Sequence, residues 1–251
     1  VGDTWPEATP TFEQVTATLK ILGKDSDVDL FLKKTRSAQQ DLEAIVLQET
    51  AKGVAHTFED SFVYGDSAVS ANEFDGLHKL VPSGQTLSLS ADATPDPLTL
   101  AKLDELIDLV KPGKPDLLLM SRRTRRSLSK YARASSSPIQ FAPDEFGSRA
   151  AFYDGIPIAV SDFLVDTELL TAGGVYSAKT GGTAASVFAL QFGERALLGI
   201  QGTEGIAVEP LGTLETKDAS RHRIKWYVAV VLQRTQAAAQ LTGISGADVT
   251  A

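Results

Sequence analysis

Residues 103–128 read LDELIDLVKPGKPDLLLMSRRTRRSL, a stretch that passes from a helical pattern to a strand pattern and back. DLLLM, residues 116–120, is almost wholly apolar, as expected of a strand buried on both faces. Ser121 is placed to cap a following helix that runs to about Arg133. The preceding helix stops at 111–113, and its apolar stripe consists of Leu103, Leu106, Ile107 and Val110.

This helix–strand–helix unit extends to residue 96 on its N-terminal side. Asp96 is the expected N-cap, and Pro97 suits the first helical position. Residues 96–133 therefore predict an α/β unit, and the sequence after it is β-rich. There we expect a Gly-rich loop at 171–186, a fraying tail after Arg234, and short strands at 155–162, 186–192, 196–201, 205–210 and 222–234.

A long helix is expected earlier in the chain. Residues 36–62 contain no proline and carry apolar side chains at helical spacing. They predict one helix of about 25 residues, nearly 40 Å long at ~1.5 Å per residue. Such a helix exceeds the usual globular length. A polar loop from Tyr64 to Gly76 follows it.

Residues 12–35 alternate between apolar and polar side chains on both sides of a polar turn at 23–27. Two alternating runs around such a turn predict a long β-hairpin. Because an isolated hairpin is marginally stable in water, its apolar face is expected to pack on another surface, and another chain is one candidate for that surface. The residues of this candidate interface are Phe12, Val15, Leu19, Ile21, Val28, Leu30 and Leu32.

The composition excludes several classes of protein. The 251 residues include no cysteine, so a disulfide framework, a thiolate zinc site and a cysteine nucleophile are ruled out. No run of about 18 apolar residues occurs, so we expect no membrane partner. The net charge of −8 argues against a protein that coats DNA with a basic surface. The length suffices for a core without metal or disulfide support.

Known catalytic and ligand motifs are missing from the sequence. It contains no phosphate-binding glycine loop, no nucleophile elbow and no His-Glu-x-x-His pattern. The three histidines, His56, His78 and His222, lie far apart in the sequence and are expected to be packed or hydrogen-bonded rather than to bind a metal. We therefore expect no catalytic residues, no metal and no cofactor.

The spacing of three aspartates resembles that of a calcium-binding loop, but the other residues that such a loop requires are missing. Asp25, Asp27 and Asp29 match its first three ligand positions. The glycine expected next is Leu30, and the glutamate expected at position twelve is Arg36. Hydrophobic alternation explains the aspartate spacing better, so these residues are expected on a solvated turn and strand face.

The densest charge cluster lies in the helix after Ser121. Its basic residues Arg122, Arg126, Lys130 and Arg133 fall on one helical face. One interpretation is solvation or ion pairing with acidic groups, and the other is contact with the phosphates of DNA. No aromatic residues are interleaved and the chain is acidic, which favours ion pairing.

The order of these elements resembles that of a known family. An extended arm, an alternating segment, one long helix, EDSFVYGDSAVSANEFDGL, the 103–128 unit, YDGIPIAVSD and the strands FGERALLGIQGTEGIAVEP and RHRIKWYVAVVLQRTQAAAQL follow in turn. This order is similar to that of the major capsid proteins of tailed double-stranded-DNA bacteriophages, which have the Hong Kong 97-type fold. The resemblance covers about residues 12–241.

The resemblance implies an α+β fold with five regions. Its E-loop hairpin would lie across an adjacent subunit, and its long helix would be the spine helix. The implied regions are an N-terminal arm at 1–11, the E-loop at 12–35, the spine helix and following loop of a peripheral domain at 36–95, an axial domain at 96–204, and the returning peripheral strands and tail at 205–251.

The resemblance also implies a function and partners. The chain would be a non-enzymatic major capsid protein whose hexamers and pentamers form an icosahedral shell around double-stranded DNA, held without sequence specificity. Portal, scaffolding or protease, and decoration proteins would be its other partners. It would reside in the virion after assembly in the host cytoplasm. Because the only asparagine is Asn72, we expect no Lys–Asn cross-link.

Two alternatives remain beside this expectation. An encapsulin-like protein nanocompartment has the same fold, and a fold does not fix a function. An α/β ligand-binding protein or enzyme would instead place its site at 171–186 or around the acidic residues of the loop after the long helix. Turn and cap roles are commoner for aspartates at such places. These residues are Asp60, Asp66, Glu73 and Asp75.

Overall fold

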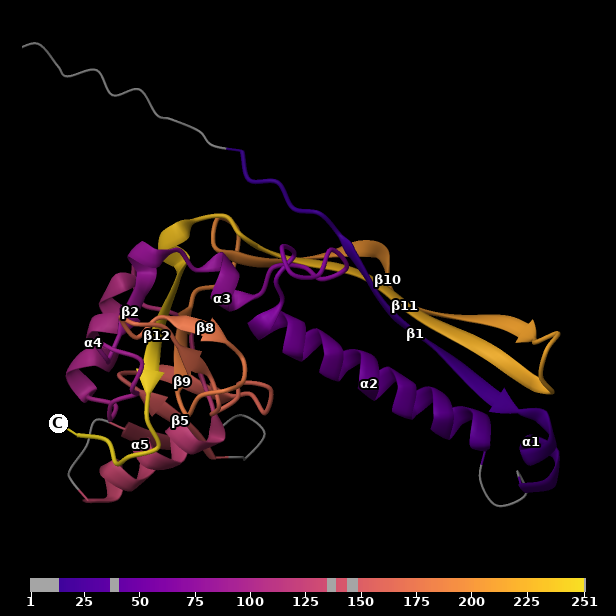
Figure 1. The fold of residues 1–251 in the computed structure, drawn as a ribbon, viewed down its shortest axis with the longest axis horizontal. Coiled ribbons are helices and arrows are strands. Elements are labelled where there is room, and N and C mark those ends of the chain that lie inside the picture. The colour runs from indigo at the N-terminus through magenta and orange to yellow at the C-terminus, as the bar shows by residue number, and fades with distance from the viewer. Residues whose placement is uncertain (1–13, 37–40, 135–138, 144–148, 251) are drawn as a thin grey trace, which may run out of the picture.

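A long helix and a narrow sheet run side by side along one half of the computed structural model, and a broader sheet with its helices forms the other half (Figure 1). We call these halves the elongated part and the body. The structure describes residues 14–36, 41–134, 139–143 and 149–250. This mixture of helix and sheet agrees with the predicted α+β class.

The elongated part is built on three antiparallel strands in the order β1-β11-β10. These are β1 (Lys20–Asp29), β10 (Leu197–Thr213) and β11 (Ala219–Leu232). The register runs from Lys20 opposite Val228 to Asp29 opposite Ala219, so the N-terminal region is bound to a strand nearly two hundred residues later in the sequence. Strand β11 therefore has a neighbour on each side.

The long helix predicted from the apolar spacing of 36–62 is α2 (Leu42–Tyr64), and it covers one face of this sheet. It begins later than expected because the carboxylate of Asp41 caps it and accepts from the backbone N–H of Glu43 at 3.1 Å. Phe58 of α2 packs against Trp226 of β11, with ring centroids 4.7 Å apart. Short helix α1 (Leu30–Arg36) lies before α2 at the far end of the sheet (Figure 1).

The body contains a seven-stranded sheet in the order β2-β12-β9-β3-β6-β5-β4. Its strands are β2 (Thr86–Ser88), β3 (Leu117–Met120), β4 (Ile139–Pro143), β5 (Arg149–Tyr153), β6 (Ile156–Val160), β9 (Ala185–Leu190) and β12 (Ala238–Ile244). The remaining short elements are α3 (Leu77–Leu80), η1 (Ser83–Gln85), β7 (Leu169–Leu170), β8 (Tyr176–Ala178) and η2 (Thr235–Ala237).

The unit at 103–128 folds as its pattern predicts. Helix α4 (Leu100–Leu109), strand β3 and helix α5 (Arg122–Ala134) follow one another, and the hydroxyl of Ser121 caps α5 by accepting from the N–H of Thr124. The N-cap predicted at Asp96 is wrong. Thr99 caps α4 instead, because its hydroxyl accepts from the N–H of Lys102, while Asp96 bridges to β12.

The hairpin predicted at 12–35 is not formed. The segment 23–27, expected as its turn, lies inside the continuous strand β1, and 30–36 is helical. The alternation was real, but the partner is β11 rather than a second local strand. Likewise the strands expected at 196–201 and 205–210 join into β10, which has a register shift between Gln201 and Ile206.

The expected fraying tail is also wrong, because it contributes β12 to the interior of the body. All seven residues of β12 are buried, and the strand lies between β2 and β9. Small residues permit this tight packing. The polar side chains of Gln240 and Thr242 form hydrogen bonds, although Oε1 of Gln240 has no hydrogen-bond partner among the described residues. The hydroxyl of Thr242 donates to the carbonyl oxygen of Gly174 at 2.8 Å, and the amide of Gln240 donates to Thr86.

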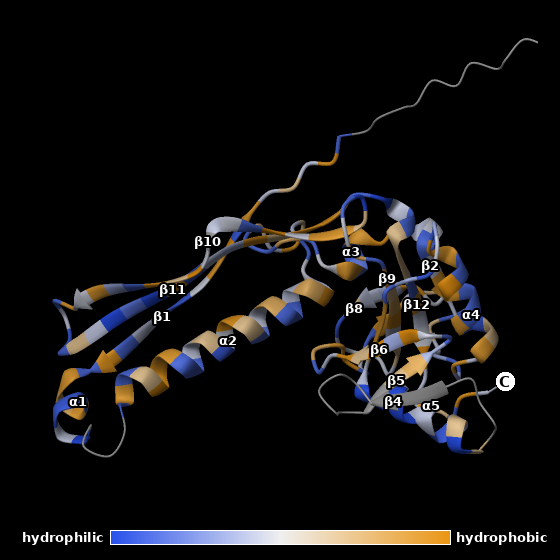
Figure 2. Ribbon diagram, turned by 180° about the vertical axis from the view of Figure 1, so that it is seen from behind, coloured by the Kyte–Doolittle hydropathy of each residue, from blue (hydrophilic) through white to orange (hydrophobic). Residues whose placement is uncertain are grey.

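Two apolar clusters form the core. One lies within the body and includes Leu103, Leu106 and Leu241. The other joins the two halves, because it unites Val63 of α2, Phe188 of β9 and Val228 of β11 with neighbouring residues. Because this second cluster is buried, the junction between the two halves is a packed interior. Along α2, apolar and polar residues alternate (Figure 2).

Replacing Leu241 by alanine tests the role of β12. Leu241 is 0 % exposed, so Leu241→Ala should lower the free energy of unfolding by about 2–5 kcal/mol. Urea unfolding of the unassembled chain measures this. Val69→Ala is the control, since Val69 is 87 % exposed and its replacement should change stability by at most about 0.5 kcal/mol. Equal effects would show that β12 is not part of the core.

Candidate assembly surfaces

The candidate interface residues of segment 12–35 do not share one environment: some are exposed to solvent and others are buried in the chain. Val15, Leu19 and Ile21 are exposed, by 50 %, 43 % and 68 %. Val28 is only 2 % exposed, so its assignment to an interface with another chain is wrong. Phe12 lies outside the described residues. The other two members, both half-buried on α1, are Leu30 and Leu32.

The geometry of β1 explains this division. Successive side chains of a strand point to opposite faces, and the position numbers of Ile21 and Val28 differ by an odd number. A turn at 23–27 would have reset this alternation, but the strand continues through it. Val28 therefore faces the interior of the elongated part, and Ile21 faces the other side of the sheet.

Two bidentate ion pairs join β1 to β11 across that other face. The guanidinium of Arg221 donates to both oxygens of Asp27 at 2.6 and 2.8 Å. Arg223 binds Asp25 in the same way at 2.7 and 2.9 Å. Hydrogen bonds from these arginines lower the pKa of each aspartate below its ordinary value. The aspartates therefore bind arginine on a strand face, in place of the calcium loop that their spacing suggested.

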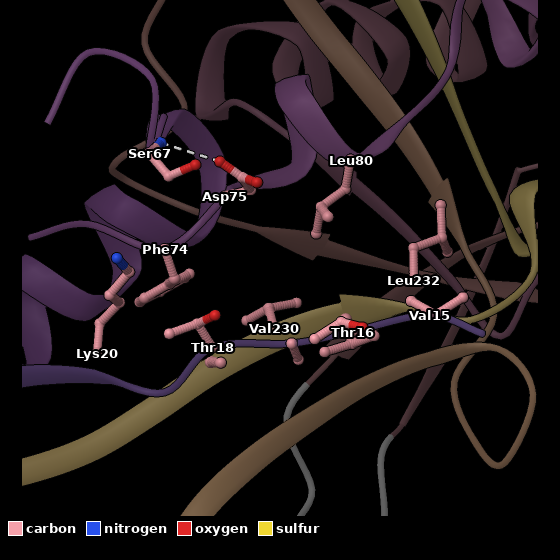
Figure 3. A pocket seen from close by; sticks show the side chains of 13 residues that line it. Val15, Thr16, Thr18, Lys20, Ser67, Phe74, Asp75, Leu80, Val230 and Leu232 are labelled. Atoms are coloured by element: carbon pink, nitrogen blue, oxygen red, sulfur yellow. Dashed lines mark hydrogen bonds between the residues drawn. The ribbon is translucent and has the colours of Figure 1, made fainter. Parts of the chain in front are cut away.

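The chain before β1 lines a cavity of about 200 Å³ (Figure 3). Residues 15–18 form one wall and residues 229–232 of β11 form another, together with Phe74 and Leu80. The Lys20 ammonium donates to the carbonyl oxygen of Ala71 at 2.6 Å, which ties the start of β1 to the neighbouring loop.

That loop, residues 65–76, contains hydrogen bonds between its own side chains and backbone. Asp66 accepts from the N–H of Ala68 at 2.8 Å, and this bond is the main cause that lowers the Asp66 pKa. Asp75 accepts from the N–H of Ser67 at 2.9 Å. Both aspartates thus form the turn hydrogen bonds that are common for aspartates in such loops. The loop presents Val69 to solvent.

The acidic residue that joins most elements is one that sequence reasoning missed. Glu168 is 0 % exposed and precedes β7. One of its oxygens accepts from the hydroxyl of Tyr64 at 2.6 Å and lies 3.2 Å from Nε2 of His78. The other accepts from the hydroxyl of Ser186. These partners come from α2, α3 and β9, so the carboxyl group links the elongated part to the body.

Aromatic rings close around this carboxyl group. The rings of His78 and Tyr176 stack with centroids 3.7 Å apart, and Tyr64 stacks on His78 at 5.2 Å. Burial, reinforced by Glu168, raises the pKa of Tyr64, and burial raises that of Tyr176 to about 12. Both hydroxyls therefore keep their protons. His78 is packed and hydrogen-bonded, as the sequence predicted.

The arginine-rich helix α5 presents its four predicted basic residues on one exposed face. Arg122 pairs with Asp162, and Lys130 binds both oxygens of Asp248 at 2.7 and 2.8 Å. Among the described residues, Arg126 and Arg133 have no carboxylate within ion-pair distance. Half of the face is therefore neutralised inside the chain, which agrees with the interpretation as ion pairing for those two residues.

Metal and membrane features are not found in the part of the chain that the structure describes. No group of three or more histidine or acidic side chains there has a metal-binding arrangement. In the same ranges, no helix combines the length and apolar character needed to cross a bilayer. The surface features that could contact other chains are the strand edges, the exposed apolar residues and the charged helix face.

Within the described ranges, the elongated part combines unpaired strand edges with exposed apolar side chains, which are features typical of surfaces that contact other chains. The chain belongs to the phage capsid family, whose model matches residues 2–178. It is thus a shell-forming capsid protein of the Hong Kong 97-type fold, as the order of its elements predicted. No match was found among the curated proteins.

Solved structures agree on the fold. The SrpI encapsulin of Synechococcus elongatus is 18 % identical, with a TM-score of 0.72, over 93 % of this chain and 76 % of that one. The capsid of a native GTA particle is 14 % identical, with a TM-score of 0.61, over 97 % and 82 %. The capsid of Myoviridae phage XM1 is 12 % identical, with a TM-score of 0.57, over 90 % and 74 %.

Replacing Tyr64 by phenylalanine tests the link between the two halves. The change removes the donor to Glu168 and the acceptor of the Val165 N–H. Because both groups are then left without that partner in the interior, we expect a loss of about 1–3 kcal/mol in urea unfolding. Tyr227→Phe on the other face of the sheet is the control. Equal stability of the two variants would contradict the structural role of Glu168.

The arginine–aspartate pairs predict a pH dependence. The folded pKa of Asp25 and Asp27 lies below the ordinary 3.8, so the pairs stabilise the chain fully above that pH. Their contribution should disappear as the pH falls through the lowered values. The stability difference between the parent and the D25N/D27N variant should therefore shrink below about pH 4.

Urea unfolding of the unassembled chain at several pH values measures this difference. An R221Q/R223Q variant should lose the same pH dependence, because it removes the donors that lower both pKa values. A parent-to-variant difference that stays constant through pH 3 would count against the ion pairs as stabilising contacts.

Proposed function

We propose that this chain is the major capsid protein of a tailed double-stranded-DNA bacteriophage. Many copies would form hexamers and pentamers of an icosahedral shell around the DNA. The observation that carries the proposal is the family match over residues 2–178, on a chain whose long sheet leaves apolar strand positions exposed. A subunit that must contact several neighbours needs such an extended surface.

The two halves would correspond to the peripheral and axial regions that the resemblance implies. The elongated part would be the peripheral domain, with α2 as its spine helix, and the body would be the axial domain. The boundaries differ from 96–204 and 205–251, because β10 begins at Leu197 in the long sheet and β12 returns to the body. The interface role of the predicted E-loop would then fall to residues 14–36.

The proposal includes no catalysis. The aspartates of the loop after α2 form turn hydrogen bonds, and Glu168 is enclosed by Tyr64, His78 and Ser186 with no exposed surface. A buried carboxyl group without access for a substrate supports a structural role. The packaged DNA would be held without sequence recognition, and Arg126 and Arg133 are the residues best placed to contact phosphates.

Further partners belong to the same proposal. Portal, scaffolding or protease, and decoration proteins would join the shell, which would assemble in the host cytoplasm and reside in the virion. An encapsulin-like compartment is the second candidate. The specific observation in its favour is the TM-score of 0.72 with the SrpI encapsulin.

Purified particles from a producing strain test the proposal. Electron microscopy should show closed shells, and particles of a phage head should be empty or contain nuclease-protected DNA. A compartment would instead contain a protein cargo, which mass spectrometry detects. A chain of 26.7 kDa that remains monomeric under all assembly conditions, without particles in cells, would contradict both candidates.

A further inference from the structure

The long sheet has an open edge at β10 that exposes apolar side chains. β10 is the last strand in the order β1-β11-β10, so its outer backbone edge has no partner strand among the described residues. Ile206 and Val208 lie opposite Trp226 and Ile224 and share their face of the sheet. Such an edge is a template for pairing with another chain.

Coverage by α2 stops short of β10. Glu43 of α2 contacts His222 of β11 at 2.9 Å, and Phe58 packs on Trp226. On the same face, Ile206 is 59 % exposed and Val208 is 51 % exposed. This face of β10 therefore combines free backbone groups with apolar side chains in solvent.

The length of the open stretch is limited. Register shifts occur between Gln201 and Ile206 and between Pro210 and Gly212, and Pro210 has no backbone N–H to donate. These irregularities leave residues 206–209 as the regular section of the exposed edge. A partner for this section would be a short extended segment with apolar residues at alternate positions.

Such a segment exists in the same chain, directly before β1. Residues 14–19 are exposed and have no regular secondary structure. Val15, Ala17 and Leu19 alternate with Thr16 and Thr18, a composition that favours strands. Figure 2 shows this alternation of apolar and polar colour along the coil that leads into β1.

The chain's own sheet does not take up this segment. The β1–β11 ladder ends at Lys20 opposite Val228, although the register would continue with Leu19 opposite Ala229. Instead, residues 15–18 and 229–232 line the cavity of about 200 Å³. The segment also continues β1, which lies on the opposite side of β11 from β10. It therefore cannot reach the β10 edge of its own chain.

We propose that residues 14–19 of one copy add as a strand to residues 206–209 of β10 in the next copy. The inference rests on the proposed shell function and names the segments that meet. Val15, Ala17 and Leu19 would lie beside Ile206 and Val208, which removes both apolar sets from water. Because the donor and acceptor edges differ, the contact is head-to-tail, and repeated head-to-tail contacts form rings when the rotation between neighbouring copies closes.

Cross-linking in assembled particles tests the pairing. The parent has no cysteine, so a short bismaleimide reagent reacts only with thiols that are introduced. In the Ala17→Cys/Val208→Cys variant, denaturing gels should show a ladder that extends beyond dimers, since each copy links to two neighbours. Each single variant should give no ladder beyond dimers. Ala17→Cys/Val69→Cys is the matched control, since Val69 is exposed on a different loop, and should give no ladder.

A second variant tests the same contact without the bismaleimide cross-linker. Ile206→Thr/Val208→Thr keeps the β-branched shape and should lower particle yield, while the melting temperature of the unassembled chain stays unchanged. Val69→Thr should leave the yield at the parent level.

Three results would overturn the inference. The first is an intrachain link in an Ala17→Cys/Val231→Cys variant of assembled particles, which would show that the segment closes onto its own β11. The second is normal shells with no ladder from the Ala17→Cys/Val208→Cys pair. The third is an unchanged yield for the threonine variant. A parent chain that forms no particles at all would instead contradict the proposed function, so the two failures are distinguishable.

Discussion

The pairing of β1 with β11 is the constraint on which the elongated part depends. It binds residues near the start of the chain to a strand near its end, and the register is fixed by Asp25 and Asp27 opposite Arg223 and Arg221. Because β11 also pairs with β10, one central strand holds two edge strands. A narrow sheet of this kind cannot enclose its own core, so α2 covers one face and part of β10 stays uncovered.

The buried carboxyl group of Glu168 joins this elongated part to the body. Its partners lie on α2, α3 and β9, and the apolar cluster around Val63, Phe188 and Val228 continues across the same junction. A fully buried acidic side chain is costly unless its oxygens are hydrogen-bonded, and here both accept. The two halves therefore meet through a specific polar contact as well as apolar packing, which suits a subunit that must present fixed edges.

The sequence predicted the local elements well where their signals were local. The helix stop at 111–113, the strand at 116–120 and the Ser121 cap all lie within one stretch, and the structure confirms them. Strand β1 was misread because Gly23 and its polar neighbours resemble a turn, while the arginines that pair with them are remote in sequence. The β12 strand was missed because its alanines, glycine and threonine gain burial only through contacts with distant strands.

The candidate surfaces were predicted in part for the same reason. Exposure of Val15, Leu19 and Ile21 follows from alternation, whereas the burial of Val28 depends on the continuous strand. Glu168 gave no signal in the sequence, since its partners are far apart along the chain.

A cryo-EM reconstruction of assembled particles tests the central claim most directly, namely that the long sheet carries the contacts of a shell. The account predicts density of a neighbouring chain along the β10 edge, and closed shells in which only the body touches its neighbours would contradict it.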